Sequence, residues 1–426
     1  MNDDTTGVAG RLDEAPRRLS AALDTVAQRI SSADLIDVVR ALEELKNVAT
    51  AMQAVAAVDF ARAQRAEHLR CGVPADRVGR GVAEQVALAR RESPHHGAVF
   101  LGVASILVAE MPHALAAMAA GVLTEQRAQI LVHETSCVSR EVRAQVDEVV
   151  AGDLERLSEL GTRRLTGLVR AETYRRDPAS AVARVARAEA DRFVWSRPAP
   201  DCMVKLTALL PVAQGVAAFA ALVRAADSAQ ASGDPRTRGQ VMADELVVRI
   251  TGQTRADAVP VALHVVMPAD TLLARGDQPG RVLGNGPVPA EVARRLVGAS
   301  PRLASWVRRL YESPAGGLVA MDSHERLFPK GLAQFITIRD DLCRTPYCDA
   351  QIRHIDHVIP YAEEGPTSEA NGQGLCERCN HAKQAPGWKA RTIFRDLSPE
   401  GTSGPHEVVL TTPSGHSYLS RSLDGS

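Results

Sequence analysis

The residues best suited to do chemistry lie late in the chain, where four of its seven cysteines cluster. They form two close pairs, Cys343 with Cys348 and Cys376 with Cys379, separated by four and two residues. Each such pair can place two thiolates on one metal ion, and two pairs complete a tetrahedral zinc site. Because four thiolates leave no open coordination position, the predicted zinc is structural.

Polar residues with catalytic potential lie between and beside these pairs. Asp356 and His357 follow one another where apolar and polar residues alternate, which predicts a short strand. Asn371 falls in the loop that follows, and Asn380 falls in a segment with helical spacing. The sequence therefore predicts a strand–loop–helix unit held at both ends by zinc.

These residue types could hydrolyse a phosphodiester with the help of a metal. His357 can take a proton from water near neutral pH. Asp356 is a hard oxygen ligand suited to Mg²⁺ or Mn²⁺, and Asn380 can give a second oxygen. Asn371 could hold the His357 ring in the tautomer that leaves a basic nitrogen facing the water. An ion held in this way would stabilise the charge that develops on the scissile phosphate.

Residues 343–389 resemble the HNH endonuclease module, which has the ββα-metal fold. The resemblance rests on the Asp356–His357 pair, the Gly365-Pro-Thr turn, the LCxxCNxxK run and the paired cysteines. The signature positions here are His357, Asn371 and Asn380, as in the His-Asn-Asn variant. The resemblance implies a histidine base, one divalent ion on Asp356 and Asn380, and a middle asparagine that orients the base. It also implies products with 5′-phosphate and 3′-hydroxyl ends.

The segment departs from the family pattern at two places. Many relatives have a His-His pair where this chain has Cys379-Asn380, and His381 follows at once. A shifted register would make His381 the metal ligand; we favour Asn380 because zinc needs Cys379. The loop before Pro366 often has two glycines, whereas this chain has Glu363-Glu364-Gly365. Two extra carboxylates there should weaken the approach of DNA.

Two stretches hold a local excess of basic residues. Residues 381–395 contain four Lys or Arg and no acidic residue, and we predict that Lys383, Lys389 and Arg391 contact phosphates. Residues 163–205 hold ten Lys or Arg against five Asp or Glu. A plain solvated surface is the alternative for both stretches.

The resemblance extends upstream. Residues 20–325 resemble the helical domain of unknown function that precedes HNH modules in the 13E12 repeat family. The match lies in Met111-Pro112, Gly121–Arg127, Gly233–Arg238 and Gly286–Glu291. The family assigns no chemistry to these segments.

The predicted fold is mainly α with an α+β middle region: an N-terminal helical bundle and a C-terminal zinc-stapled ββα-metal module. Apolar spacing predicts helices over residues 31–68, 81–91, 98–110, 112–120, 124–134, 140–160, 212–229, 236–251, 290–297 and 329–341. Strands are predicted over 191–197, 203–210 and 259–267, and a hairpin over 407–411 and 417–419. The predicted domains are a disordered tail (1–15), a helical domain (16–189), its α+β continuation (190–325), the HNH module (326–397) and a Gly/Ser/Pro-rich tail with a possible hairpin (398–426).

Composition sets the wider limits. The chain has 426 residues, 50 basic against 51 acidic, and a net charge of −1. This average does not exclude DNA, since a bound divalent ion can serve as the main phosphate contact. The odd cysteine count predicts a protein without disulfides. The acidic first residues predict a cytoplasmic protein without a membrane partner. The oligomeric state stays open.

The sequence thus predicts a metal-dependent DNA endonuclease that uses Zn²⁺ structurally and Mg²⁺ or Mn²⁺ catalytically. One alternative is a non-catalytic, zinc-dependent DNA-binding or mobile-element protein that keeps the HNH fold only for binding. Another makes the helical region an interaction domain that delivers or restrains the nuclease. The target site, strand preference and biological role cannot be predicted.

Overall fold

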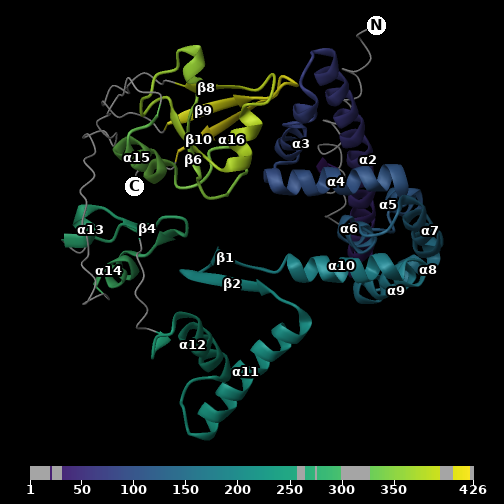
Figure 1. Cartoon of the computed structure of the whole chain (residues 1–426), viewed down its shortest axis with the longest axis horizontal. Helices are drawn as coiled ribbons and strands as arrows, with labels where there is room; N and C mark the ends of the chain where they lie inside the picture. Colours follow the sequence, from purple (N-terminus) through teal and green to yellow (C-terminus); the bar gives the residue numbers. More distant parts are fainter. Residues whose placement is uncertain are drawn as a thin grey trace. The chain divides into compact units, whose positions relative to one another are not determined.

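The computed structural model in Figure 1 describes residues 20–21, 31–256, 264–273, 276–298, 327–393 and 406–422. The chain divides into two compact units, one of residues 1–59 with 102–181 and the other of residues 60–101 with 182–426. Helices dominate the first unit, and small sheets occur in the second. The predicted fold class, mainly α with an α+β middle and a C-terminal ββα module, is confirmed.

The first unit is a bundle of helices around one apolar core. Its elements are part of α2 (Ser32–Arg70), part of α4 (Pro94–Glu110), α5 (Pro112–Ala119), α6 (Glu125–Glu134), α7 (Arg140–Ala151), α8 (Leu154–Glu159), α9 (Thr162–Arg176) and the start of α10 (Pro178–Ala190). Leu107, Met111, Leu131, Val146 and Leu165 are buried together in the core. Within single helices the buried residues are four apart, as with Val146 and Val150 on α7 and Leu165 and Val169 on α9, which is the helical pattern that the sequence predicted.

Caps decide where several of these helices begin and end. We predicted one helix over 140–160, but the structure has two, α7 and α8. Gly152 follows the end of α7, and the side chain of Asp153 accepts the N–H of Arg156 at the start of α8. The buried carboxylate of Asp147 accepts the N–H groups of His113 and Ala114, 2.8 and 2.9 Å away, and so caps α5. Burial raises the pKa of Asp147.

Before the C-terminal part, the second unit contains helices, a β-hairpin and a small three-stranded sheet. Its elements before residue 327 are the end of α2, η1 (Ala75–Arg77), α3 (Val82–Arg90), the start of α4, most of α10, β1 (Phe193–Ala199), β2 (Met203–Leu209), α11 (Val212–Ala231), α12 (Arg238–Thr251), β3 (Val265–Val266), α13 (Ala269–Leu273), β4 (Gly280–Val282), β5 (Gly286–Val288) and α14 (Ala290–Gly298). β1 and β2 pair antiparallel, as do β3 with β4 and β4 with β5. Of the predicted strand 259–267, residues 259–263 lie outside the described residues, and β3 is its described end.

The C-terminal part of this unit carries the predicted nuclease motif. It contains α15 (Lys330–Asp340), β6 (His354–His357), η3 (Tyr361–Glu363), β7 (Gly372–Leu375), α16 (Glu377–Lys383), β8 (Lys389–Ile393), β9 (Glu407–Thr411) and β10 (Ser417–Arg421). β6 and β7 pair antiparallel, with His357 opposite Gly372, and α16 follows them as a ββα unit. The hairpin predicted near the C-terminus is confirmed as β9–β10. It pairs with β8 in a three-stranded sheet.

None of the described helices is by itself long and apolar enough to cross a membrane, although α4 and α5, bent by 109°, reach that length and composition together. The predicted domain boundaries stay predictions, and the predicted tail 1–15 lies outside the described residues.

Candidate active site and metal centre

The four clustered cysteines form a metal site. Their Sγ atoms lie within 4.8 Å of one another, and all four side chains are buried. The Sγ atoms of Cys348 and Cys376 are 3.9 Å apart. Four sulfurs at about 2.3 Å from a zinc ion in tetrahedral geometry lie about 3.8 Å from one another, so the cluster fits zinc. The structural metal predicted from the spacing of the cysteines is therefore supported by their geometry.

Backbone hydrogen bonds shape both cysteine pairs. The N–H of Cys343 donates to the carbonyl of Ala350, and that of Cys348 donates to Thr345. Between them Tyr347 adopts a left-handed conformation with φ of +64°. At the other pair, Cys376 caps α16 by accepting the N–H of Cys379. Local backbone hydrogen bonds thus hold both cysteine pairs in a conformation suited to binding one metal ion.

The thiols cannot all ionise at this distance without a cation. The hydrogen bond with Cys343 raises the pKa of Cys379, whereas the hydrogen bond with Cys348 lowers the pKa of Cys343. A divalent ion supplies the positive charge that lets four neighbouring thiols exist as thiolates.

His357 is buried at the end of β6, where its ring is held by contacts on two sides. The ring centroids of Phe328 and Tyr361 lie 4.5 and 5.8 Å from that of His357. The Nε2 atom of His357 lies 2.8 Å from the hydroxyl of Thr367, which is itself buried. Sequence reasoning missed Thr367 as a partner of the histidine, although the Gly365-Pro-Thr turn that contains it was part of the recognised motif.

Asn371 holds the loop that carries this threonine. Its Oδ1 accepts the N–H of Ile359 at 2.9 Å, and its Nδ2 donates to the carbonyls of Ile359 and Pro366 at 3.1 and 2.8 Å. We expected this amide to hold the His357 ring. The structure instead gives the hydrogen bond on Nε2 to Thr367, because both N–H groups of Asn371 are used by backbone carbonyls.

The same loop explains how the chain accommodates its two glutamates. Gly365 has no room for a side chain, since a Cβ there would lie 1.9 Å from the carbonyl oxygen of Ile359. Glu364 has a φ of +63°, a conformation that favours glycine. Glu363 and Glu364 are both exposed, so their carboxylates remain solvated.

Asp356 faces α16 and forms an ion pair with Lys383. Its Oδ2 lies 2.6 Å from the Lys383 ammonium group, which also donates to the carbonyl of His357. Only 10% of the Lys383 side chain is exposed. The structure therefore places Lys383 against the predicted metal ligand and not on an open, phosphate-facing surface.

The geometry of α16 bears on the choice between Asn380 and His381. Asn380 precedes Lys383 by three residues and lies on the same side of the helix. Its Oδ1 is 3.5 Å from the side-chain amide of Gln384. His381 precedes Lys383 by two residues, which turns it about 200° around the helix, and it is exposed.

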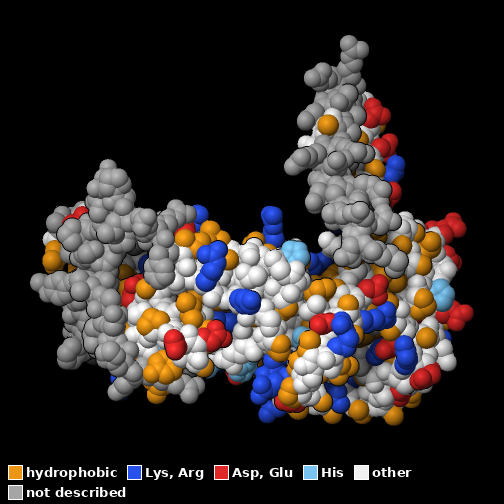
Figure 2. Space-filling model, turned by 90° about the horizontal axis from the view of Figure 1, so that it is seen from above, with side chains coloured by type: hydrophobic (Ala, Val, Ile, Leu, Met, Phe, Trp, Pro, Cys, Tyr) orange, Lys and Arg blue, Asp and Glu red, His pale blue; other side chains and the backbone are white. Residues whose placement is uncertain are grey.

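The remaining predicted phosphate contacts lie on β8. Lys389 and Arg391 are exposed and two residues apart, so they project from the same face of the strand. Arg395 lies outside the described residues. On the face of the molecule seen in Figure 2, basic side chains are interspersed with acidic ones.

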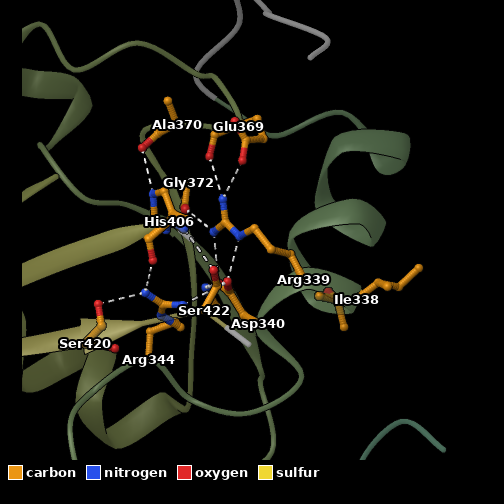
Figure 3. A network of polar contacts seen from close by, with 12 residues as sticks. Ile338, Arg339, Asp340, Arg344, Glu369, Ala370, Gly372, His406, Ser420 and Ser422 are labelled. Atoms are coloured by element: carbon orange, nitrogen blue, oxygen red, sulfur yellow. Dashed lines mark hydrogen bonds and ion pairs between the residues drawn. The ribbon is translucent and has the colours of Figure 1, made fainter. Parts of the chain in front are cut away.

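A network of buried charges braces this loop from α15 (Figure 3). The Arg339 guanidinium pairs with the buried Asp340 carboxylate, and it also donates to the carbonyls of Glu369 and Gly372. The other Asp340 oxygen accepts the N–H of Gly374 on β7 at 2.7 Å. Both residues therefore act on the segment that contains Asn371.

The C-terminal hairpin joins the same network (Figure 3). Arg344, next to the first zinc ligand, donates to the carbonyls of His406 and Ser420. His406 Nε2 lies 2.9 Å from the carbonyl of Ala370. Burial lowers the pKa of His406 to about 4, so the ring is neutral at pH 7 and donates from Nε2 to this carbonyl.

Comparison with known families agrees with this architecture. The family model for a domain of unknown function, DUF222, matches residues 39–340, which is more than half of the chain. The family model for HNH endonucleases matches residues 343–385. The second match covers the zinc ligands, β6, β7 and α16, and it supports a nuclease-type function.

The individual relatives are similar in sequence, but all of them are uncharacterized, so they indicate no activity. The chain is 32% identical over 222 residues to the uncharacterized protein Rv3776 of Mycobacterium tuberculosis, covering 43% of this chain and 40% of that protein. It is 35% identical over 138 residues to the uncharacterized proteins MT2160 and Rv2100 of the same species, covering 32% of this chain and 22% of each. The chain thus spans less than half the length of these relatives. No solved structure matches it significantly.

Loss of one zinc ligand should remove the metal. We expect the purified chain to hold about one zinc ion and Cys376→Ser to lose it, with a melting temperature lower by roughly 10 °C. Metal analysis and thermal unfolding measure both effects. Cys202→Ser changes an exposed cysteine outside the cluster and should keep the zinc. Full metal content in Cys376→Ser would contradict the assignment.

The partly buried His406 should make the fold sensitive to acid. Its pKa near 4 lies below the ordinary value of 6.5. Its neutral form therefore stabilises the fold fully above pH 6.5, and this contribution is lost as the pH falls toward 4. His406→Gln keeps a donor for Ala370 but does not titrate, so between pH 7 and pH 5 it should lose about 2 kcal/mol less stability. Urea denaturation at the two pH values measures this, and equal losses would contradict it.

Proposed function

Because the chain belongs to the DUF222 family and carries an HNH endonuclease domain, we propose that it is a metal-dependent DNA endonuclease with His357 as its general base. The observation that supports this most directly is a buried, hydrogen-bonded histidine that follows an aspartate paired with Lys383, on one ββα unit whose four cysteines fit zinc. A module used only for binding does not need that pairing.

The contacts of His357 suit a base that takes a proton from water. The Thr367 hydroxyl lies 2.8 Å from Nε2. In the proposed tautomer Nε2 donates to this hydroxyl, and the lone pair of the base is on Nδ1. The rings of Phe328 and Tyr361 limit rotation of the imidazole. A base held in one orientation accelerates hydrolysis, typically by 10²–10⁴-fold.

Asp356 and Asn380 are the proposed ligands of the catalytic ion, Mg²⁺ or Mn²⁺. Carboxylate and amide oxygens are the donors that these hard cations prefer. Asp356 already binds a cation, the Lys383 ammonium group, and its second carboxylate oxygen is a further donor. A bound divalent ion would stabilise the negative charge that develops on the scissile phosphate.

The proposed substrate is DNA, with Lys389 and Arg391 as phosphate contacts on β8. The proposed products carry 5′-phosphate and 3′-hydroxyl ends. A cytoplasmic location and the absence of a membrane partner stay predictions from the sequence.

A second candidate is a non-catalytic, zinc-dependent DNA-binding protein. The Asp356–Lys383 ion pair favours it, because the ammonium group already neutralises the carboxylate that a catalytic ion needs. In this case Lys383 acts as a permanent substitute for the ion.

Removal of the proposed base should abolish cleavage. In a plasmid-nicking assay with Mg²⁺ or Mn²⁺, His357→Ala should lower the rate by at least about 100-fold. His354→Ala is the matched control, since it changes an exposed histidine on the same strand and should nick like the parent. If His357→Ala nicked DNA like the parent, His357 would not be the general base. If the parent bound DNA without nicking it, the non-catalytic DNA-binding protein would be favoured.

The same assay separates the two candidate ligands on α16. Asn380→Ala should raise the Mg²⁺ concentration needed for half-maximal nicking by about tenfold or more, because it removes an oxygen donor. His381→Ala should leave this concentration unchanged, since His381 faces away from the side of α16 that meets Asp356. The opposite pattern would establish the shifted register.

A further inference from the structure

A segment of the DUF222 region packs directly against the nuclease module. It comprises residues 73–85, which lie in the same compact unit as α16. Glu84 Oε1 accepts from Arg378 Nε at 2.7 Å, and only 11% of the Glu84 side chain is exposed. Gln85 Oε1 accepts the N–H of Ser414 at 3.3 Å. An ion pair thus connects the segment to α16, and a hydrogen bond connects it to the C-terminal hairpin.

Gly81 shows that this contact is close. Its φ is +82°, and a Cβ there would lie 2.6 Å from Trp388 Nε1 and 3.1 Å from Ala385 Cβ. Any larger residue would therefore have to displace the indole, and the left-handed conformation would strain it as well. The preceding residues are held against the end of α16.

These preceding residues form a basic hollow beside the proposed active site. The hollow has a volume of about 210 Å³ and is lined by Val73, Pro74, Arg77, Arg80, Gln384, Ala385 and Pro386. Gln384 directly follows Lys383, which contacts Asp356 and His357. The hollow therefore begins at the C-terminal end of α16.

The charge of the hollow comes from arginines exposed to solvent. Arg80 is exposed, and the described residues include no hydrogen-bond or ion-pair partner for its side chain. Arg77 is 61% exposed, and among the described residues its one charged partner is the neighbouring Asp76, at 4.0 Å. The acidic Glu84 does not offset this charge, since it pairs with Arg378.

We propose that Arg77 and Arg80 are phosphate-binding residues for the DNA strand that continues from the proposed active site into this hollow. The guanidinium group suits this role, because it is always charged and can bind phosphate oxygens through two parallel hydrogen bonds. The inference rests on the proposed nuclease function, and it gives the DUF222 region a direct part in substrate binding.

The test measures binding of a labelled 30-bp DNA duplex by the full chain over a range of KCl concentrations, together with plasmid nicking. Arg77→Gln/Arg80→Gln should raise the Kd on the order of tenfold and reduce the slope of log affinity against log salt by about 2, since two phosphate contacts are lost. Arg40→Gln/Lys46→Gln removes two exposed charges from α2 and is the matched control, expected to bind like the parent. Zinc content and melting temperature check that each variant is folded.

The outcomes separate this inference from the proposed function. A parent that nicks DNA while the Arg77/Arg80 variant binds and nicks like it would overturn the inference alone. A parent that shows the arginine-dependent binding without nicking would overturn the nuclease and leave the inference. If the double variant fails to fold, Arg77→Lys/Arg80→Lys decides the matter: it should keep the salt slope but bind more weakly, because lysine cannot bind bidentately. Parent-like affinity in that variant would contradict the role of the guanidinium groups.

Discussion

Convergence of four buried cysteines on one metal site is the constraint on which the HNH module depends. β6, β7 and α16 have only four, four and seven residues, and their apolar cluster consists of the cysteines themselves and Leu375. So small a core supplies little free energy of folding. Zinc bound to the four cysteines would supply folding energy directly, because these ligands come together only in the folded chain. A metal ion held by these four cysteines would join the chain before β6 to the start of α16, and would thereby fix the strand that carries Asp356 and His357 against the helix that carries Asn380.

Buried charged side chains also fix the position of the loop between β6 and β7. Asp340 accepts hydrogen bonds from Arg339 and from the backbone of β7, and Arg344 and His406 connect the C-terminal hairpin to the same loop. Buried ion pairs gain little net stability because desolvation offsets their attraction. Their effect here is geometric: the loop is held at Ala370 and Asn371, and it presents Thr367 to the imidazole of His357.

The boundary between the two family matches is not a boundary in space. The matches meet between residues 340 and 343, yet residues 60–101 share a compact unit with the nuclease motif. The ion pair between Glu84 and Arg378 joins residues 294 positions apart. The region of unknown function therefore makes direct contacts with the module.

The sequence by itself determined the properties that depend on near neighbours. The spacing of the cysteine pairs, the alternation around Asp356 and the helical spacing after Cys376 are local patterns, so the metal site and the ββα order could be predicted from them. The break between α7 and α8 was also local, but a continuous apolar pattern hid the cap at Asp153. Tertiary structure alone decided that Thr367 and not Asn371 bonds to His357, that Lys383 pairs with Asp356, and that β9 pairs with β8. These contacts join residues that are distant along the chain or compete for one partner, and only the folded geometry selects among them.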